Sequence, residues 1–148
     1  MAGTSVSFGM DIKAMRSGIA KAAARIRDRR TLAEDIGEML VSSTQDRFES
    51  GQGPDGTPWQ PSQRAGREGG KTLVDNATLR NSIGYEASAM AVMVGSNLVY
   101  ARPHQEGGQV GRGLAVTLPA RPYLGISDED LDEAGQMVVD HIARGFRG

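Results

Sequence analysis

The sequence predicts an α+β fold: two N-terminal helices, a small antiparallel sheet with a long loop, and a C-terminal helix. Apolar residues recur at helical spacing near both ends of the chain, whereas short segments between them alternate as strands do. Helices followed by strands and a closing helix are typical of α+β proteins. We expect one domain over residues 1–148, with flexible loops at about 49–72 and 105–113.

The first helix is predicted over residues 12–26, where apolar residues recur at alternating spacings of three and four. This spacing places them on one narrow stripe. They are Ile12, Met15, Ile19, Ala22 and Ile26. Residues 13–30 carry seven basic side chains and one acidic one, so this segment has a net charge of +6 and forms the basic pole of the molecule.

A second helix is expected to begin at Thr31, because Thr31 and Glu34 have the spacing of a capping box. Its apolar stripe comprises Leu32, Ile36, Leu40, Ser43 and Phe48, with Met39 alongside. The other side of this helix is acidic, which makes the first two helices complementary in charge.

The middle of the chain is predicted to hold a long loop and then a hairpin. Residues 51–72 show no helical or strand period, and residues 73–80 suggest a short helix capped by Asp75 or Asn76. Residues 82–87 and 91–96 have the pattern of a hairpin. Residues 98–101 either extend that hairpin or begin another strand.

The last third of the chain begins with a second loop at 107–113. Strict alternation over 114–118 then predicts a half-buried strand. Ser127 is expected to cap a final helix whose acidic first turn, solvated rather than metal-binding, complements the helix dipole. The first-turn acids are Asp128, Glu129 and Asp130, and the expected apolar stripe is Leu131, Ala134, Val138 and Ile142.

Composition excludes several classes of function. The chain has no cysteine and two histidines, which excludes disulfides, thiol catalysis and a local histidine-rich metal site. A net charge of −1 argues against a general nucleic-acid coat, and no apolar run is long enough to span a membrane. We therefore expect a soluble protein that is made and used in a cytoplasm, with no membrane partner.

Two glycine-rich stretches resemble nucleotide loops only superficially. Gly70-Lys71-Thr72 fits the end of a phosphate loop, but a prolyl segment precedes it where a buried strand is required. Pro54-Asp55-Gly56 instead predicts the corner of a turn. The sequence favours a mobile basic loop over a nucleotide site.

Two residues, Trp59 and His104, admit two interpretations each. Trp59 packs on its own core or anchors a neighbouring subunit, as tryptophan often does at interfaces, and both can be true. His104 is the one plausible acid–base residue, but a loop-ordering hydrogen bond from its ring is favoured over catalysis. His141 is expected to be packed against the chain.

Taken together, the loop and the residues after it carry a resemblance to a known family. The residues are Arg47-Phe48, Pro54-Asp55-Gly56, Pro58-Trp59, Leu73, Leu79, Ser82-Ile83, Val94-Gly95, Tyr100-Ala101, His104-Gln105, Gly107-Gly108 and the run from Pro119 to Gly125. In order and spacing they resemble the phage virion morphogenesis family, which includes the tail completion proteins of contractile-tailed and Mu-like phages.

The resemblance implies a structural virion protein at the head–tail junction that is not an enzyme, with no catalytic residues, no cofactor and no metal. It implies a homo-oligomeric ring, expected to be a hexamer, that completes or terminates the tail and contacts tail tube or sheath proteins and head-side connector proteins. Assembly is expected in the host cytoplasm, followed by residence in the virion. The alternatives are a head-side stopper or adaptor, a nucleotide-binding or hydrolytic enzyme, and a DNA-binding module that uses the basic first helix.

Candidate functional residues fall into three sets. The candidates for a subunit or partner interface, or for loop ordering, are Trp59, Arg64, Arg67, Tyr100, His104 and Gln105. The candidates for a structural motif are Pro54, Asp55, Gly56, Pro119, Arg121 and Pro122. Arg64, Arg67 and Lys71 are candidates for contacting DNA in a lumen, where basic side chains would favour phosphate non-specifically.

Overall fold

The computed structural model describes residues 12–74 and 77–147. In chain order the elements are α1 (Ile12–Arg27), α2 (Arg29–Ser50), α3 (Gln63–Glu68), α4 (Thr78–Asn81), β1 (Gly84–Ala87), β2 (Val92–Gly95), α5 (Ala101–Glu106), β3 (Gly108–Val110), the 3-10 turn η1 (Arg112–Leu114), β4 (Val116–Leu118) and α6 (Asp128–Arg147). The predicted α+β class is confirmed, although the strands form two separate two-stranded antiparallel sheets.

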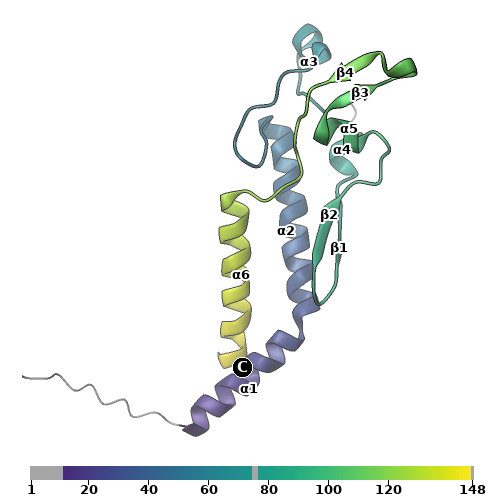
Figure 1. Ribbon diagram of the computed structural model, residues 1–148. Helices are drawn as coiled ribbons and strands as arrows, with labels where there is room; N and C mark the ends of the chain where they lie inside the picture. The colour runs from purple at the N-terminus through teal and green to yellow at the C-terminus, as the bar shows by residue number, and fades with distance from the viewer. Residues whose placement is uncertain (1–11, 75–76, 148) are drawn as a thin grey trace, which may run out of the picture.

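The molecule is elongated around the long helix α2 (Figure 1). α6 runs antiparallel beside α2, α1 crosses below both helices, and the β1–β2 hairpin lies along the other side of α2. α3, α4, α5 and the β3–β4 pair gather beyond the C-terminal end of α2. No helix among residues 12–74 and 77–147 is both long and apolar enough to cross a membrane.

The break between the first two helices falls at Asp28, three residues before the predicted start. The capping box at Thr31 is therefore wrong: the Thr31 hydroxyl donates to the Asp28 carboxylate at 2.8 Å, and Glu34 pairs with Arg30 instead. Because a single residue separates the helices, no extended backbone is available at Thr31 to form such a cap. α1 packs chiefly against α6 rather than against α2.

α2 is covered on two sides, so its burial does not follow the single predicted stripe. Its buried residues are Ala33, Gly37, Thr44, Arg47 and Phe48. At Gly37 the hairpin approaches closely, since a Cβ there would lie 2.4 Å from the ring of Tyr85. Glycine is required at this point because the Tyr85 ring rests directly on the helix backbone.

The predicted hairpin is confirmed: β1 and β2 pair from Gly84↔Gly95 to Ala87↔Val92. The prediction that 98–101 is strand is wrong, because the chain turns there and enters α5. The predicted loop at 107–113 contains β3 and η1. β4 is shorter than predicted and mostly exposed, because within the described residues it pairs with β3 alone.

The predicted long loop is organised rather than irregular throughout. Ser62 caps α3 by accepting a hydrogen bond from the Ala65 amide at 3.1 Å, and Gln52 forms a bridge with Pro58. The short helix after it is confirmed as α4, although it begins only at Thr78. The predicted caps Asp75 and Asn76 lie outside the described residues.

The core lies at the C-terminal end of α2, where the elements beyond it meet the helix. Its buried side chains are Phe48, Trp59, Leu79, Ile83, Ala101 and Tyr123. They come from α2, the loop after it, α4, the residues between α4 and β1, α5 and the segment before α6, so one cluster joins regions far apart in sequence.

α6 begins where the sequence predicts, but the side of the helix that faces the rest of the molecule is not the predicted one. The Ser127 hydroxyl accepts from the Asp130 amide at 3.0 Å, and the Ser127 amide donates back to the Asp130 carboxylate at 3.0 Å. Asp130, His141 and Gly145 are the buried residues of the helix. The predicted apolar stripe is wrong in part, because Leu131 and Val138 are exposed, whereas Ala134 and Ile142 are half-buried.

Substituting Gly37→Ala is expected to lower the free energy of unfolding by about 1 kcal/mol. The clash with the Tyr85 ring, typically about 1–3 kcal/mol for overpacking, outweighs a gain of about 0.5–1 kcal/mol in helix propensity. The matched control is Gly135→Ala in α6, where a Cβ meets nothing within 4 Å and stability is expected to rise. Urea unfolding measures both, and equal stabilisation by the two changes would contradict the close approach.

Candidate interaction site

A buried arginine anchors the segment that leads into α6. Arg47 Nη1 donates to the carbonyl oxygens of Tyr123 at 2.8 Å and Gly125 at 3.1 Å. Its Nη2 pairs with the Asp130 carboxylate and also donates to the Ser43 hydroxyl at 3.3 Å. One guanidinium on α2 therefore holds both the connecting segment 119–125 and the first turn of α6.

Asp130 is not the solvated carboxylate that its place in an acidic first turn predicted. It is buried, and burial alone would raise its pKa. Hydrogen bonds from the Ser43 hydroxyl and the Ser127 amide, together with the charge of Arg47, outweigh burial and hold the pKa of Asp130 below its usual value. The ion pair is thus fully formed at neutral pH.

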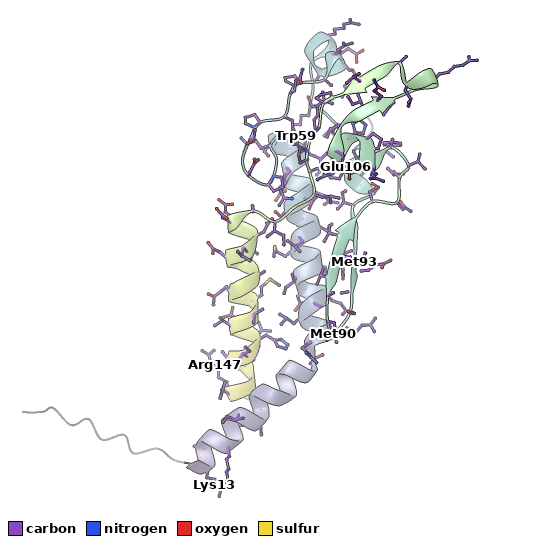
Figure 2. All side chains as sticks on the ribbon, in the orientation of Figure 1. Lys13, Trp59, Met90, Met93, Glu106 and Arg147 are labelled. Atoms are coloured by element: carbon purple, nitrogen blue, oxygen red, sulfur yellow. The ribbon has the colours of Figure 1, made fainter. Side chains whose placement is uncertain are left out.

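Aromatic packing fixes the same segment from the other side. The ring of Phe48 lies 5.6 Å from Trp59, edge-on, and 5.3 Å from Tyr123. Trp59 Nε1 donates to the Pro122 carbonyl oxygen at 2.8 Å. Figure 2 places Trp59 beside the C-terminal end of α2, and its burial corresponds to the first of its two interpretations, packing on its own core.

Gln105 orders this segment through its side-chain amide. Its Oε1 accepts from the amides of Tyr123 and Leu124, each at 2.9 Å, and its Nε2 donates to the Leu124 carbonyl oxygen at 3.1 Å. The Tyr123 hydroxyl donates to the Ala101 carbonyl oxygen at 2.8 Å. Gln105 thus performs the loop-ordering role proposed for it within one chain.

The predicted turn at Pro54-Asp55-Gly56 is confirmed. The Gly56 amide donates to the Gly53 carbonyl oxygen at 3.0 Å, and the Asp55 carboxylate accepts from the amide and the hydroxyl of Thr57, each at 2.9 Å. These two bonds hold the pKa of Asp55 below its usual value. The turn carries the chain from α2 toward Trp59.

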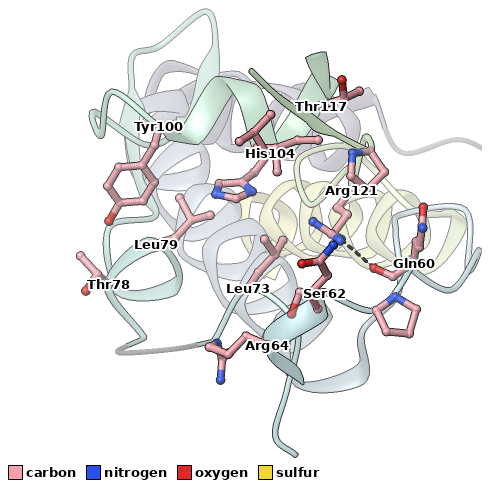
Figure 3. A pocket seen from close by; sticks show the side chains of 15 residues that line it. Gln60, Ser62, Arg64, Leu73, Thr78, Leu79, Tyr100, His104, Thr117 and Arg121 are labelled. Atoms are coloured by element: carbon pink, nitrogen blue, oxygen red, sulfur yellow. Dashed lines mark hydrogen bonds between the residues drawn. The ribbon is translucent and has the colours of Figure 1, made fainter. Parts of the chain in front are cut away.

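A cleft of about 590 Å³ opens between α3, α4, α5 and β4 (Figure 3). Leu73, Leu79 and Leu118 contribute its apolar lining, and five of the predicted site residues also line it. These five are Arg64, Tyr100, His104, Pro119 and Arg121. The described lining residues include two arginines and no Asp or Glu, so this lining is electropositive.

Arg121 is the most buried cation of the cleft, with 4% of its surface exposed. Its Nε donates to the Gln60 carbonyl oxygen at 2.7 Å, and its backbone amide donates to the His104 carbonyl oxygen at 2.8 Å. Within residues 12–74 and 77–147, no Asp or Glu pairs with this guanidinium. The orientation of its side chain into the cleft can be followed in Figure 3.

His104 shares the cleft with Arg121. The sequence predicts a loop-ordering hydrogen bond from its ring, but the Nδ1 atom makes none. This atom is buried without a partner in the part of the chain that the structure describes. The Tyr100 ring lies edge-on at 6.2 Å, and Tyr100 itself is 41% exposed. Burial, and secondarily the charge of Arg121, lowers the pKa of His104, so the imidazole is neutral at pH 7.

The three basic residues proposed to face DNA have different environments. Arg64 lines the cleft and donates to the Lys71 carbonyl oxygen at 3.0 Å, whereas Lys71 pairs with Glu49. Arg67 is exposed on α3. Only Arg67 of the three is a simple exposed cation, so the structure adds little support for a lumen contact through this set.

Gly70-Lys71-Thr72 is not part of a phosphate loop. Within the described residues no strand precedes Gly70, and the next helix, α4, begins several residues after Thr72. The Thr72 hydroxyl instead accepts from the Ser62 amide at 3.1 Å. Within the described chain, no three His, Asp or Glu side chains gather as a metal ion would require.

Sequence reasoning missed the pair between Arg47 and Asp130. The available signal was a polar row, Ser43, Thr44 and Arg47, on the side of α2 that also carries Phe48. Charged side chains on a core face are rarely buried unless they are paired. That row did not identify Asp130 as the partner, because 83 residues separate the two charges.

Comparisons with known proteins agree with the resemblance in the sequence. The profile of the phage virion morphogenesis family matches residues 10–143. Mu-like prophage FluMu G protein 2 of Haemophilus influenzae is 39% identical over 72 residues, which cover 49% of this chain and 52% of that protein. The chain thus spans about half the length of that relative.

Tail completion protein S of Escherichia phage P2 is 29% identical over 128 residues. The match covers 78% of this chain and 85% of that protein. No solved structure matches the chain.

Substituting Arg47→Met is expected to lower the free energy of unfolding by about 3–5 kcal/mol, because it leaves the buried Asp130 charge without its cation. The matched control is Arg102→Met, which removes an exposed pair with Glu106 and is expected to change stability far less. Urea unfolding measures both variants. Equal losses of stability in the two variants would show that the buried pair of Arg47 contributes no more than the exposed pair of Arg102.

Substituting Arg121→Gln is expected to raise the pKa of His104, because a nearby cation that opposes protonation is removed while burial remains. An NMR titration of the imidazole measures the change, with Arg67→Gln as the control of equal charge. An unchanged pKa would contradict the electrostatic coupling across the cleft.

Acidification is expected to destabilise the protein through His104. Its pKa is lower in the folded protein than in the unfolded chain, so its contribution to stability is complete above an unfolded pKa of about 6.5 and is lost as the pH falls below it. Unfolding at pH 7 and pH 5, in the wild type and in His104→Gln, isolates this contribution. A pH dependence that is the same in both proteins would refute it.

Proposed function

The chain belongs to the phage virion morphogenesis family, and from this premise we propose that it completes or terminates the phage tail and allows the tail to join the head. The observation that carries the proposal is the similarity to tail completion protein S over 78% of this chain. The protein acts as a structural component at the head–tail junction, built in the host cytoplasm and retained in the virion. Its neighbours there are tail tube or sheath proteins on one side and head-side connector proteins on the other.

An exposed apolar face on α6 supports the self-association part of the proposal. Leu131, Val139 and Phe146 are 63%, 57% and 53% exposed. With Val138 they lie within about a third of the helix circumference, because successive residues are about 100° apart. We define these four residues as the outer face of α6, where the ring of Phe146 also packs on Gly18 of α1; exposed apolar side chains on one face of a helix favour a protein neighbour.

The position of this face suits a ring. α6 stands alongside α2 at one side of the elongated molecule, away from the β1–β2 hairpin (Figure 1). The hairpin side is built from other elements, with Met93 exposed on β2 and pointing away from α2 (Figure 2). Two different sides on one subunit permit a head-to-tail contact, and repeated contacts of that kind close into a ring. A hexamer is the ring size that the family resemblance suggests.

Electron microscopy of lysates from a phage that lacks this gene tests the proposed function. We expect full heads beside tails that are unjoined or of uncontrolled length. Normal tails beside emptied heads would contradict it and favour the head-side stopper or adaptor role. Normal joined particles would reject both roles.

Substituting Val139→Asp is expected to weaken self-association at least tenfold, because it places a charge in an apolar contact. The matched control is Val99→Asp, the same change at a side chain that is 94% exposed and outside α6. Sedimentation velocity measures assembly, and urea unfolding checks that both monomers fold. Equal assembly of the two variants would exclude the outer face of α6 as the subunit contact.

A further inference from the structure

The electropositive cleft contains a cation whose partner is missing from the described chain. Arg121 is almost fully buried, yet the side-chain hydrogen bond that it makes within the described residues is a single donation from Nε to the Gln60 carbonyl oxygen at 2.7 Å. A buried guanidinium with one neutral partner is costly, because a full charge has been largely withdrawn from water. The remaining donors border the cleft, where an anion would compensate the charge.

The unpaired Nδ1 atom of His104 indicates the same ligand. It is buried without a hydrogen-bond partner, in a ring that lines the same cleft as Arg121. A neutral imidazole protonated on Nδ1 can donate to an anion. The guanidinium of Arg121 and the unpaired Nδ1 of His104 therefore border one cavity, and none of its described lining residues is an Asp or Glu.

The chemistry of the walls favours a carboxylate on an apolar chain over a phosphate on DNA. Leu73, Leu79 and Leu118 line the cavity, and apolar walls strengthen an ion pair by excluding water. A duplex presents its phosphates on a broad surface that exposed cations reach, whereas Arg121 is 4% exposed inside a cavity of about 590 Å³. A single acidic side chain can enter such a space.

The rim of the cleft offers a way to hold the chain that carries this side chain. β4 lines the cleft and pairs with β3 alone, so the other edge of this two-stranded sheet has no strand on it in the described residues. An extended segment can add to such an edge through backbone hydrogen bonds. Tyr100 supplies an exposed aromatic ring at the same opening, and tyrosine is enriched where proteins bind each other.

We propose that the cleft receives an Asp or Glu side chain from an extended segment of a partner protein, with Arg121 as its counter-ion and His104 as a second donor. This inference rests on the proposed function, which supplies protein neighbours during tail assembly. It adds the chemistry of recognition: an acidic residue flanked by apolar ones. Arg121 binds the carboxylate, and β4 aligns the segment.

The test uses two capped peptides with the sequences Thr-Val-Glu-Val-Thr and Thr-Val-Gln-Val-Thr, and the full chain. NMR titration follows the His104 imidazole and the amides of β4. The peptide that contains Glu is expected to bind with a Kd of about 1 mM, and the peptide that contains Gln at least tenfold more weakly. Random-sequence duplex DNA is the third ligand.

Two variants change the cleft in different ways. Arg121→Gln removes the counter-ion, and Thr117→Trp blocks the opening while Arg121 stays in place. Each is expected to weaken binding of the Glu peptide at least tenfold. Arg67→Gln is the control for charge and Met93→Trp the control for bulk, since neither residue lines the cleft. If Arg121→Gln fails to fold, Thr117→Trp decides the question.

Three outcomes would overturn the proposal. They are equal binding of the two peptides, no binding at about 10 mM peptide, and a response of His104 to duplex DNA but not to the Glu peptide. In the phage, a Thr117→Trp gene that fully restores joined particles rejects the cleft as a partner site while leaving the tail role intact. Normal particles without the gene reject the tail role itself.

Discussion

The ion pair between Arg47 and Asp130 is the interaction on which the rest of the structure depends. It joins the middle of the chain to its last helix, and the same guanidinium holds two carbonyl oxygens of the segment between them. A buried pair is not necessarily more stable than apolar packing, but it is specific, because either charge alone would be costly in the core. The pair therefore determines where α6 starts and which side of it faces α2.

The orientation of α6 follows from that requirement. Asp130 must point toward Arg47, and the next residue, Leu131, then lies about 100° further around the helix, away from α2. Leu131 and Val138 of the predicted stripe consequently face outward, with Leu131 63% exposed, whereas Ala134 and Ile142 stay half-buried. A local pattern typical of a core-facing helix thus becomes a surface suited to a neighbour, and burial of the polar pair takes precedence over burial of the stripe.

The residues that carry the family resemblance meet around one segment. Trp59 holds the carbonyl of Pro122, Gln105 holds the backbone of 123–124, and Tyr123 packs against Phe48. The same segment places Arg121 in the cleft beside His104. The architecture that joins α2, α5 and α6 therefore also presents the cleft, so the fold and the candidate site share one set of contacts.

Spacing between near neighbours in the sequence is enough to predict the α+β class, both terminal helices, the β1–β2 hairpin and the Ser127 cap. The order of motifs along the chain identifies the family. The β3–β4 pair and α5 could not be predicted, because their short segments have no period long enough to be distinctive. The burial of Asp130 and the meeting of Arg121 and His104 at one cavity are visible in the folded structure alone. Burial and pairing arise between residues far apart in the chain, and their energies select among the local patterns.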